Sequence, residues 1–176
     1  DLMRNQGLIW ASDRAEWRLR RLKRRAGRAG VFNYRSALWD GSPKLPVKTR
    51  FDGVLIDAPC SGTGTWQRNP HARWTLTPED LKELSQLQLR LLKHAASALK
   101  PGGKLVYSVC SLARSESLEV IEAFSGGTPD LCPLKFRNPL TPQANEDSQL
   151  WLYPQDFGGN GMFVACWRRT AEQKSA

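Results

Sequence analysis

Short apolar runs alternate with longer amphipathic stretches along most of the chain. Runs of strand length predict β-strands at residues 7–13, 31–34, 51–57 and 104–109. The first opens after Gly7 and ends on Asp13, as a buried parallel strand does. Because strands and helices alternate, the pattern predicts an α/β fold built on a parallel sheet.

Helical spacing of apolar residues predicts three helices. In residues 14–26 the apolar positions repeat every three or four residues while Arg and Lys fill the other face, which indicates a basic amphipathic helix. A longer helix begins at Thr77, an N-cap residue followed by Pro78, and extends to Lys100, where a Pro-Gly-Gly turn stops it. Residues 115–124 form the third predicted helix.

The last part of the chain has a different pattern. Beyond Ser125 it is rich in Pro and Gly, until residues 150–153 and 161–167 predict two closing strands with a hairpin-like, antiparallel pairing. With 176 residues the chain falls in the size range of one domain. We expect residues 1–168 to form this domain and residues 169–176 to be a frayed tail.

Charge and composition narrow the function classes. The chain has 26 Lys and Arg against 17 Asp and Glu, a net charge of +9, and much of the excess lies between Arg18 and Arg28. A polyanion such as RNA is a plausible partner, and an anionic membrane surface would be attracted too. No long uncharged apolar run could span a bilayer, so we expect a soluble protein.

The four cysteines show no paired metal-ligand spacing and are too sparse for a disulfide scaffold, which fits free thiols in a reducing cytoplasm. His71 and His94 likewise have no ligand-like neighbour in the sequence, so no metal site is expected. Cys60 and Cys110 each follow a predicted strand, and in a parallel sheet such ends meet at the ligand-binding edge. Burial is the commoner role of a lone strand-end cysteine, but a thiolate there can act as a nucleophile.

Two motifs carry a family resemblance. They are residues 57–64, Asp-Ala-Pro-Cys-Ser-Gly-Thr-Gly, and residues 107–112, Tyr-Ser-Val-Cys-Ser-Leu. Both resemble signatures of the Sun-type (RsmB-like) RNA 5-methylcytosine methyltransferases. Further matches lie at residues 68–70, 73–74, 88, 99–103 and 161–165, so the resemblance extends from Gly7 to about Arg168.

The resemblance implies S-adenosylmethionine as methyl donor and RNA, by default ribosomal RNA, as substrate. It implies that Cys110 adds to C6 of cytosine, which makes C5 nucleophilic, and that Cys60 assists removal of the C5 proton and release of the enzyme. Asp57 would contact the base or the methionine end of the cofactor, although an acid at the end of a strand can also be a plain cap.

Other residues take roles by the same resemblance. Asp13 resembles the acid that accepts hydrogen bonds from the cofactor ribose, and Asp40 the acid beside the adenine, although an Asp is common in so turn-rich a segment. Arg68, Arg73 and Trp74 are expected to hold the substrate, since Arg pairs with phosphate and Trp stacks on bases; Trp74 can equally be a core residue.

One family feature is absent from residues 1–176: the first strand and its glycine-rich cofactor loop. We therefore expect a Rossmann-like methyltransferase sheet that is truncated at its N-terminus, ends in an antiparallel strand pair, and binds the cofactor poorly by itself. A non-catalytic RNA-binding remnant of this fold is the main alternative. An amino-group methyltransferase ranks low, because it favours an Asn/Asp-Pro-Pro-aromatic loop in place of Asp57-Ala58-Pro59-Cys60.

Overall fold

The computed structural model describes residues 3–141, 143 and 145–171. The chain forms two compact units, Asp1–Thr49 and Arg50–Ala176, which are described separately. No helix in the described part of the chain is long and apolar enough to cross a membrane.

The first unit is a β–α–β arrangement of β1 (Ile9–Asp13), α1 (Glu16–Arg28) and β2 (Tyr34–Leu38). The strands pair in parallel, with Ile9 opposite Tyr34. The second strand lies later than residues 31–34, where the sequence predicted it. The reason is local: the Val31 N–H donates to the Ala26 carbonyl at 2.9 Å and so finishes the turn after α1. The strand β1 is also less buried than predicted, with Ile9 41% exposed.

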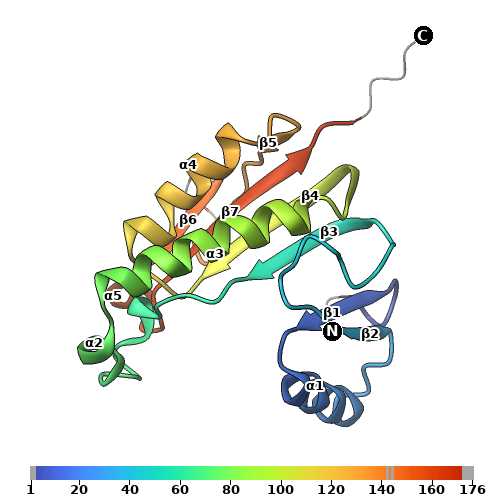
Figure 1. The fold of residues 1–176 in the computed structure, drawn as a ribbon, viewed down its shortest axis with the longest axis horizontal. Coiled ribbons are helices and arrows are strands. Elements are labelled where there is room, and N and C mark those ends of the chain that lie inside the picture. Colours follow the sequence, from blue (N-terminus) through green and yellow to red (C-terminus); the bar gives the residue numbers. More distant parts are fainter. Residues whose placement is uncertain (1–2, 142, 144, 172–176) are drawn as a thin grey trace. The chain divides into compact units, whose positions relative to one another are not determined.

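The second unit contains a mixed sheet with the strand order β3 (Phe51–Asp57), β4 (Leu99–Val109), β7 (Met162–Arg169) and β5 (Leu131–Pro133). The strand β6 (Gln149–Leu152) also pairs with β7. Figure 1 shows β3, β4 and β7 side by side. The β3–β4 pair is parallel and every pairing of β7 is antiparallel, which confirms the predicted α/β sheet with an antiparallel ending.

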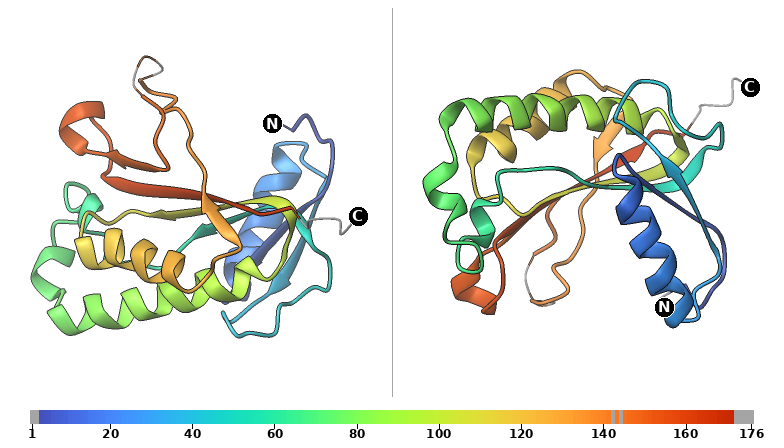
Figure 2. Two further views of the ribbon diagram at one scale, coloured as in Figure 1. Left: turned by 90° about the horizontal axis from the view of Figure 1, so that it is seen from above. Right: turned by 60° about the horizontal axis from the view of Figure 1, so that its bottom comes forward.

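Two helices, α3 (Pro78–Ala96) and α4 (Leu118–Gly126), lie side by side on one face of this sheet (Figure 2). The start of α3 is the predicted one: Thr77 and Asp80 form a reciprocal capping box, in which each side chain accepts a hydrogen bond from the other residue's backbone N–H. Between α4 and the sheet, Phe124 and Trp167 meet edge to face at 5.1 Å, and both are almost fully buried.

The structure corrects several boundaries. The helix predicted to reach Lys100 ends at Ala96, because Leu99 is fully buried and pairs with Phe51 at the start of β4. The Pro-Gly-Gly segment therefore lies inside β4, where the register with β3 shifts. The helix predicted at 115–124 is divided at Ser117, whose φ of −124° and ψ of −92° are not helical. A 3₁₀ turn, η2 (Arg114–Glu116), precedes that break.

Four further short elements were not predicted, because each is shorter than two helical turns or a typical strand. They are η1 (Thr63–Thr65), α2 (Ala72–Thr75), α5 (Pro154–Phe157) and β5. At the end of the chain β7 continues through Arg169, and the Thr170 N–H donates to the Asp130 carbonyl at 2.8 Å. The remainder of the predicted tail, residues 172–176, lies outside the described residues.

Candidate active site

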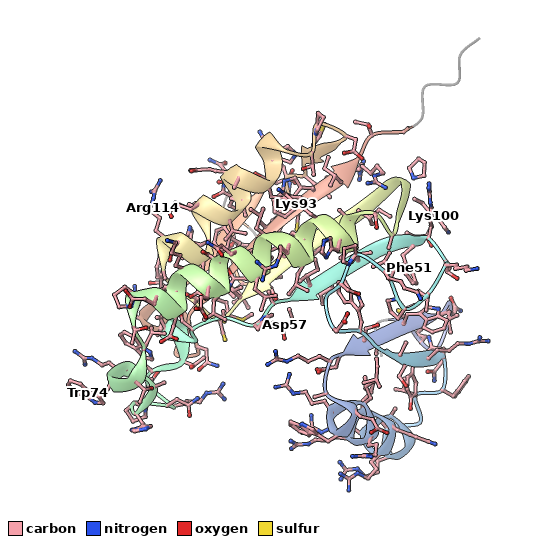
Figure 3. All side chains as sticks on the ribbon, viewed as in Figure 1. Phe51, Asp57, Trp74, Lys93, Lys100 and Arg114 are labelled. Atoms are coloured by element: carbon pink, nitrogen blue, oxygen red, sulfur yellow. The ribbon has the colours of Figure 1, made fainter. Side chains whose placement is uncertain are left out.

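The candidate site lies where β3 and β4 end side by side. These strands are parallel, and Asp57 at the end of β3 is opposite Ser108 in β4. The loop after β3 carries Cys60 and the loop after β4 carries Cys110. The two sulfur atoms lie 3.3 Å apart, so the structure brings together the two cysteines that the sequence singled out. Figure 3 shows Asp57 at this end of β3.

The cysteine pair shares a hydrogen bond that separates the acidities of the two thiols. A hydrogen bond from Cys60 lowers the pKa of Cys110 to about 7, against the opposing effects of burial and the Asp57 charge. The same hydrogen bond, together with burial and the charge on Cys110, raises the pKa of Cys60. Cys110 is therefore the thiol that ionises first, and above about pH 7 the pair holds a single proton.

The fully buried side chain of Glu116 joins the two cysteine loops. Its Oε1 accepts a hydrogen bond from the Ser61 N–H at 2.9 Å, next to Cys60. Its Oε2 accepts one from the Ser111 hydroxyl at 2.5 Å, next to Cys110, and a short one from the Ser61 hydroxyl. One acidic side chain thus fixes the residue that follows each cysteine.

Gln88 extends this network into α3. Its Nε2 donates to the Pro59 carbonyl and to Glu116 Oε1, both at 2.9 Å. The buried Tyr107 hydroxyl lies 3.0 Å from Gln88 Oε1 and 2.7 Å from the Glu116 carbonyl oxygen. The family resemblance in the sequence included Gln88 without a role, and no role was given to Glu116. A signal was present: Gln88 stands four residues from both Leu84 and Leu92, on the apolar stripe of α3.

Two glycines let the Pro-Cys loop approach the start of β7. The Gly161 N–H donates to the Gly64 carbonyl at 2.7 Å, and the Gly64 N–H donates to the Cys110 carbonyl at 3.1 Å. A Cβ on Gly64 would lie 2.2 Å from the Gly161 oxygen, so only glycine fits there. The Thr63 hydroxyl accepts from the Leu112 N–H at 2.8 Å, which adds another link between the two loops.

The predicted substrate residues lie on the segment between this loop and α3. Arg68, Arg73 and Trp74 are all exposed, and Trp74, at 77% exposure, projects from α2 in Figure 3 and is not a core residue. The Arg73 guanidinium lies 5.3 Å from the Trp74 ring centroid and 5.9 Å from that of Trp66, which the sequence did not single out. Ser61, α2 and the first half of α3 also line a pocket of about 540 Å³.

The remaining predicted residues, Asp13 and Asp40, belong to the first unit. Asp13 ends β1, and its carboxylate accepts from the Ala15 N–H at 2.8 Å and from Arg18 at 3.3 Å. Asp40 follows β2, and a hydrogen bond from the Ser42 backbone N–H lowers the pKa of its exposed carboxyl. The Trp39 N–H donates to the Asp13 carbonyl at 3.1 Å, so both acids lie at the same edge of the small sheet.

Within the part of the chain that the structure describes, no group of three or more His, Cys, Asp or Glu side chains is placed to hold a metal ion. In the first unit, the carboxylates of Asp13 and Asp40 can accept hydrogen bonds from hydroxyl and amine donors. The cysteine pair in the second unit suits covalent chemistry on an electrophilic carbon.

Known proteins are similar to this chain in sequence and in fold. The model of the family described as 16S rRNA methyltransferase RsmB/F matches residues 1–168. The probable ribosomal RNA small subunit methyltransferase B of Bacillus subtilis (strain 168) is 33% identical over 175 residues, which cover 96% of this chain and 39% of that protein. Ribosomal RNA small subunit methyltransferase F of Pectobacterium carotovorum subsp. carotovorum (strain PC1) is 35% identical over 174 residues, 95% of this chain and 36% of that protein.

Among solved structures, NSun6 from Pyrococcus horikoshii with SFG superposes with a TM-score of 0.79 and 26% identity, over 97% of this chain and 44% of that one. The chain thus spans less than half the length of each of these relatives. The family match covers nearly all of the sequence, including both cysteine loops and the closing strands. The chain belongs to the 16S rRNA methyltransferase RsmB/F family.

Proposed function

We propose that the protein transfers a methyl group from S-adenosylmethionine to C5 of a cytosine in RNA, by family ribosomal RNA, with Cys110 as the nucleophile. The carrying observation is the 3.3 Å approach of the two sulfur atoms, with the lowered pKa on Cys110. Both units would then belong to one catalytic domain, residues 1–168.

In the proposed reaction the Cys110 thiolate forms a bond to C6 of cytosine, and the electron pair of the C5–C6 double bond moves toward C5. S-adenosylmethionine, when bound, supplies the electrophilic methyl group that C5 takes up. The proton on C5 must then leave, so that the double bond can form again and Cys110 can depart from C6.

Cys60 is the proposed acceptor of this proton. In the resting pair its pKa is raised by the hydrogen bond to Cys110, by burial and by the Cys110 charge. Once Cys110 is bonded to carbon, the hydrogen bond to Cys110 and its charge no longer raise the pKa of Cys60, although burial and the Glu116 charge still do. Cys60 then ionises more readily and passes its proton to solvent. The Cys60 thiolate then accepts the C5 proton as the C5–C6 double bond forms again and the C6–sulfur bond breaks. Cys110 leaves as a thiolate, so the pair again holds one proton, on Cys60.

Asp57 is proposed to bind the N3 edge of the base or the methionine end of the cofactor. Its side chain is exposed at the end of β3, with the Ser108 hydroxyl 3.4 Å away. In the first unit, Asp13 and Asp40 are proposed to hold the cofactor, with Asp13 at the ribose hydroxyls and Asp40 beside the adenine. Their donor set fits, since carboxylates accept from hydroxyl and amine groups.

The exposed cluster of Arg68, Arg73 and Trp74 is proposed to hold the RNA. The Arg73 guanidinium lies over Trp74, so phosphates next to a base stacked near this ring would meet Arg73, and Arg68 is exposed in the same segment.

The test is covalent trapping of the full-length protein, with S-adenosylmethionine and small-subunit ribosomal RNA containing 5-azacytidine. We expect a denaturation-resistant protein–RNA adduct that Cys110→Ala abolishes. Cys60→Ala should form an adduct even with ordinary cytosine RNA, because release is blocked. RNA binding without any adduct from the parent protein would instead favour a non-catalytic RNA-binding remnant.

A further inference from the structure

The outward face of α1 combines one aromatic side chain with a row of cations. Trp17, Arg20, Arg21, Arg24 and Arg28 follow one another at i, i+3, i+4, i+7 and i+11, so they share one face of the helix. All of these side chains are exposed, whereas the apolar residues of α1 lie on the opposite face, where Ala26 is buried. Packing within the first unit therefore accounts for the apolar residues of α1, but not for the exposed Trp17 and arginines on the opposite face.

The charge on this face is largely uncompensated. In the described part of the chain, the ion pairs made by α1 are Arg18 with Asp13 at 3.3 Å and Arg20 with Glu16 at 3.4 Å. No carboxylate there pairs with Arg21, Arg24 or Arg28. Several positive charges at helical spacing repel one another, so a polyanion bound to this face would offset that repulsion.

Trp17 adds a feature that charge alone does not supply. It is 53% exposed, and the Arg18 guanidinium lies 5.3 Å from its ring centroid. Trp17 also lines a hollow of about 880 Å³ together with Arg20, Arg21, Lys23 and Arg24. An exposed indole beside guanidinium groups is the usual arrangement of a single-stranded nucleic acid site, in which bases stack and phosphates pair with cations.

We propose that α1 binds a single-stranded segment of RNA, with a base stacked on Trp17 and the flanking phosphates on Arg21 and Arg24. The inference rests on the proposed function only in taking RNA as the partner. A membrane-binding helix would turn a broad apolar face outward, whereas the outward face of α1 has a single large apolar residue. The residues of this surface belong to the first unit, whereas Arg68, Arg73 and Trp74 belong to the second.

The experiment measures binding of the full-length protein to fluorescently labelled single-stranded RNA of mixed sequence over a range of salt concentrations. Arg21→Gln with Arg24→Gln should weaken binding about tenfold and reduce the slope of log affinity against log salt by about 1.4, the value for two phosphate contacts on a single strand. Trp17→Ala should also weaken binding about tenfold, with the salt slope unchanged, and Trp17→Phe should recover most of the loss.

The matched control is Lys44→Gln with Lys48→Gln, which removes the same charge from exposed positions of the same unit. We expect it to leave the affinity within about twofold of the parent. Equal weakening by the two double variants, or no effect of Trp17→Ala, would overturn the proposal. The proposal would also be overturned if the same variants lost affinity for anionic vesicles but kept their affinity for RNA. A parent protein that binds no RNA would instead count against the proposed function, and circular dichroism separates misfolded variants from both outcomes.

Discussion

At the scale of single residues, the hydrogen bond between Cys60 and Cys110 determines which sulfur can react. Both thiols are partly buried. Their shared hydrogen bond lowers the pKa of Cys110 and raises that of Cys60, and burial and the Cys110 charge raise the pKa of Cys60 further.

This asymmetry predicts the pH dependence of alkylation. The pKa of Cys110, lowered to about 7 by Cys60, means that thiolate forms above about pH 7, so alkylation of Cys110 by iodoacetamide should rise through that pH. Cys60→Ala removes the donor while burial and the Asp57 charge remain, so the midpoint should move to higher pH. The rate is measured by mass spectrometry of the peptide that contains Cys110.

Cys60→Ser provides the control, because a serine hydroxyl keeps a hydrogen-bond donor at the same position. We expect its midpoint to lie between those of the parent and Cys60→Ala. An identical midpoint in all three proteins would show that the Cys60 hydrogen bond does not control the ionisation of Cys110.

At the scale of elements, the backbone of β7 supports the Pro-Cys loop. The loop after β3 and the first residues before β7 are connected by the Gly161 to Gly64 hydrogen bond of 2.7 Å. A side chain on either glycine would separate them: the nearest atom to a Cβ on Gly64 would lie at 2.2 Å, and on Gly161 at 2.9 Å. The segment before the antiparallel strand β7 thus helps to fix the conformation of the loop after the parallel strand β3.

Gly64→Ala should therefore lower the free energy of unfolding by at least about 2 kcal/mol, because the atom that it meets is backbone and cannot rotate away. Urea denaturation measures this change. Gly126→Ala, at the end of α4 with no atom within 4 Å of its Cβ, should leave stability unchanged or raise it by up to about 1 kcal/mol. Equal midpoints for the two variants would contradict the proposed contact.

The same elements show how much of the fold and of the candidate site could be predicted from the sequence. The boundaries of β3 were predicted to the residue, because its apolar run is bounded on both sides by charged or turn residues. The meeting of Cys60 and Cys110 followed from the parallel pairing of two strands. Gln88 and Glu116 were given no role, because they are 28 residues apart in sequence and only the folded chain brings them together.

At the scale of the whole second unit, Glu116 connects the two cysteine loops with α3 and β4. Its hydrogen bonds reach the loop after β3 through Ser61, the loop after β4 through Ser111, and α3 through Gln88. Tyr107 adds β4 through the Glu116 carbonyl. Because the Ser61, Ser111 and Gln88 donors are buried or half-buried, losing the Glu116 side chain removes an acceptor from all three at once, whereas Tyr107 keeps its bond to the Glu116 backbone carbonyl.

Glu116→Ala should accordingly lower the free energy of unfolding by at least about 3 kcal/mol, as measured by urea denaturation. Glu116→Gln should cost much less. Its amide oxygen can keep the bonds from the Ser61 N–H and Gln88 Nε2, and its amide nitrogen can face the Ser61 and Ser111 hydroxyls, which rotate to accept.

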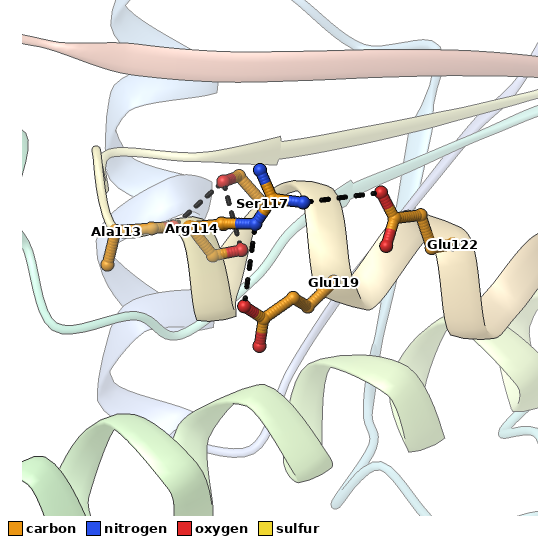
Figure 4. Close-up of polar contacts among 5 residues, drawn as sticks. All are labelled: Ala113, Arg114, Ser117, Glu119 and Glu122. Carbon is orange, nitrogen blue, oxygen red and sulfur yellow. Dashed lines mark hydrogen bonds and ion pairs between the residues drawn. The ribbon is translucent and has the colours of Figure 1, made fainter.

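Arg114 provides the contrast within the same segment (Figure 4). It pairs with Glu119 and Glu122 at 3.7 Å each, and all three side chains are more than half exposed. Arg114→Ala should therefore change stability by less than about 1 kcal/mol, since exposed ion pairs contribute little. If Glu116→Ala proved as mild as Arg114→Ala, the two cysteine loops would have to be held by their other contacts, the Gly64 to Cys110 backbone bond and the Thr63 hydroxyl bond to Leu112. Gly64→Ala would then be the variant that separates them.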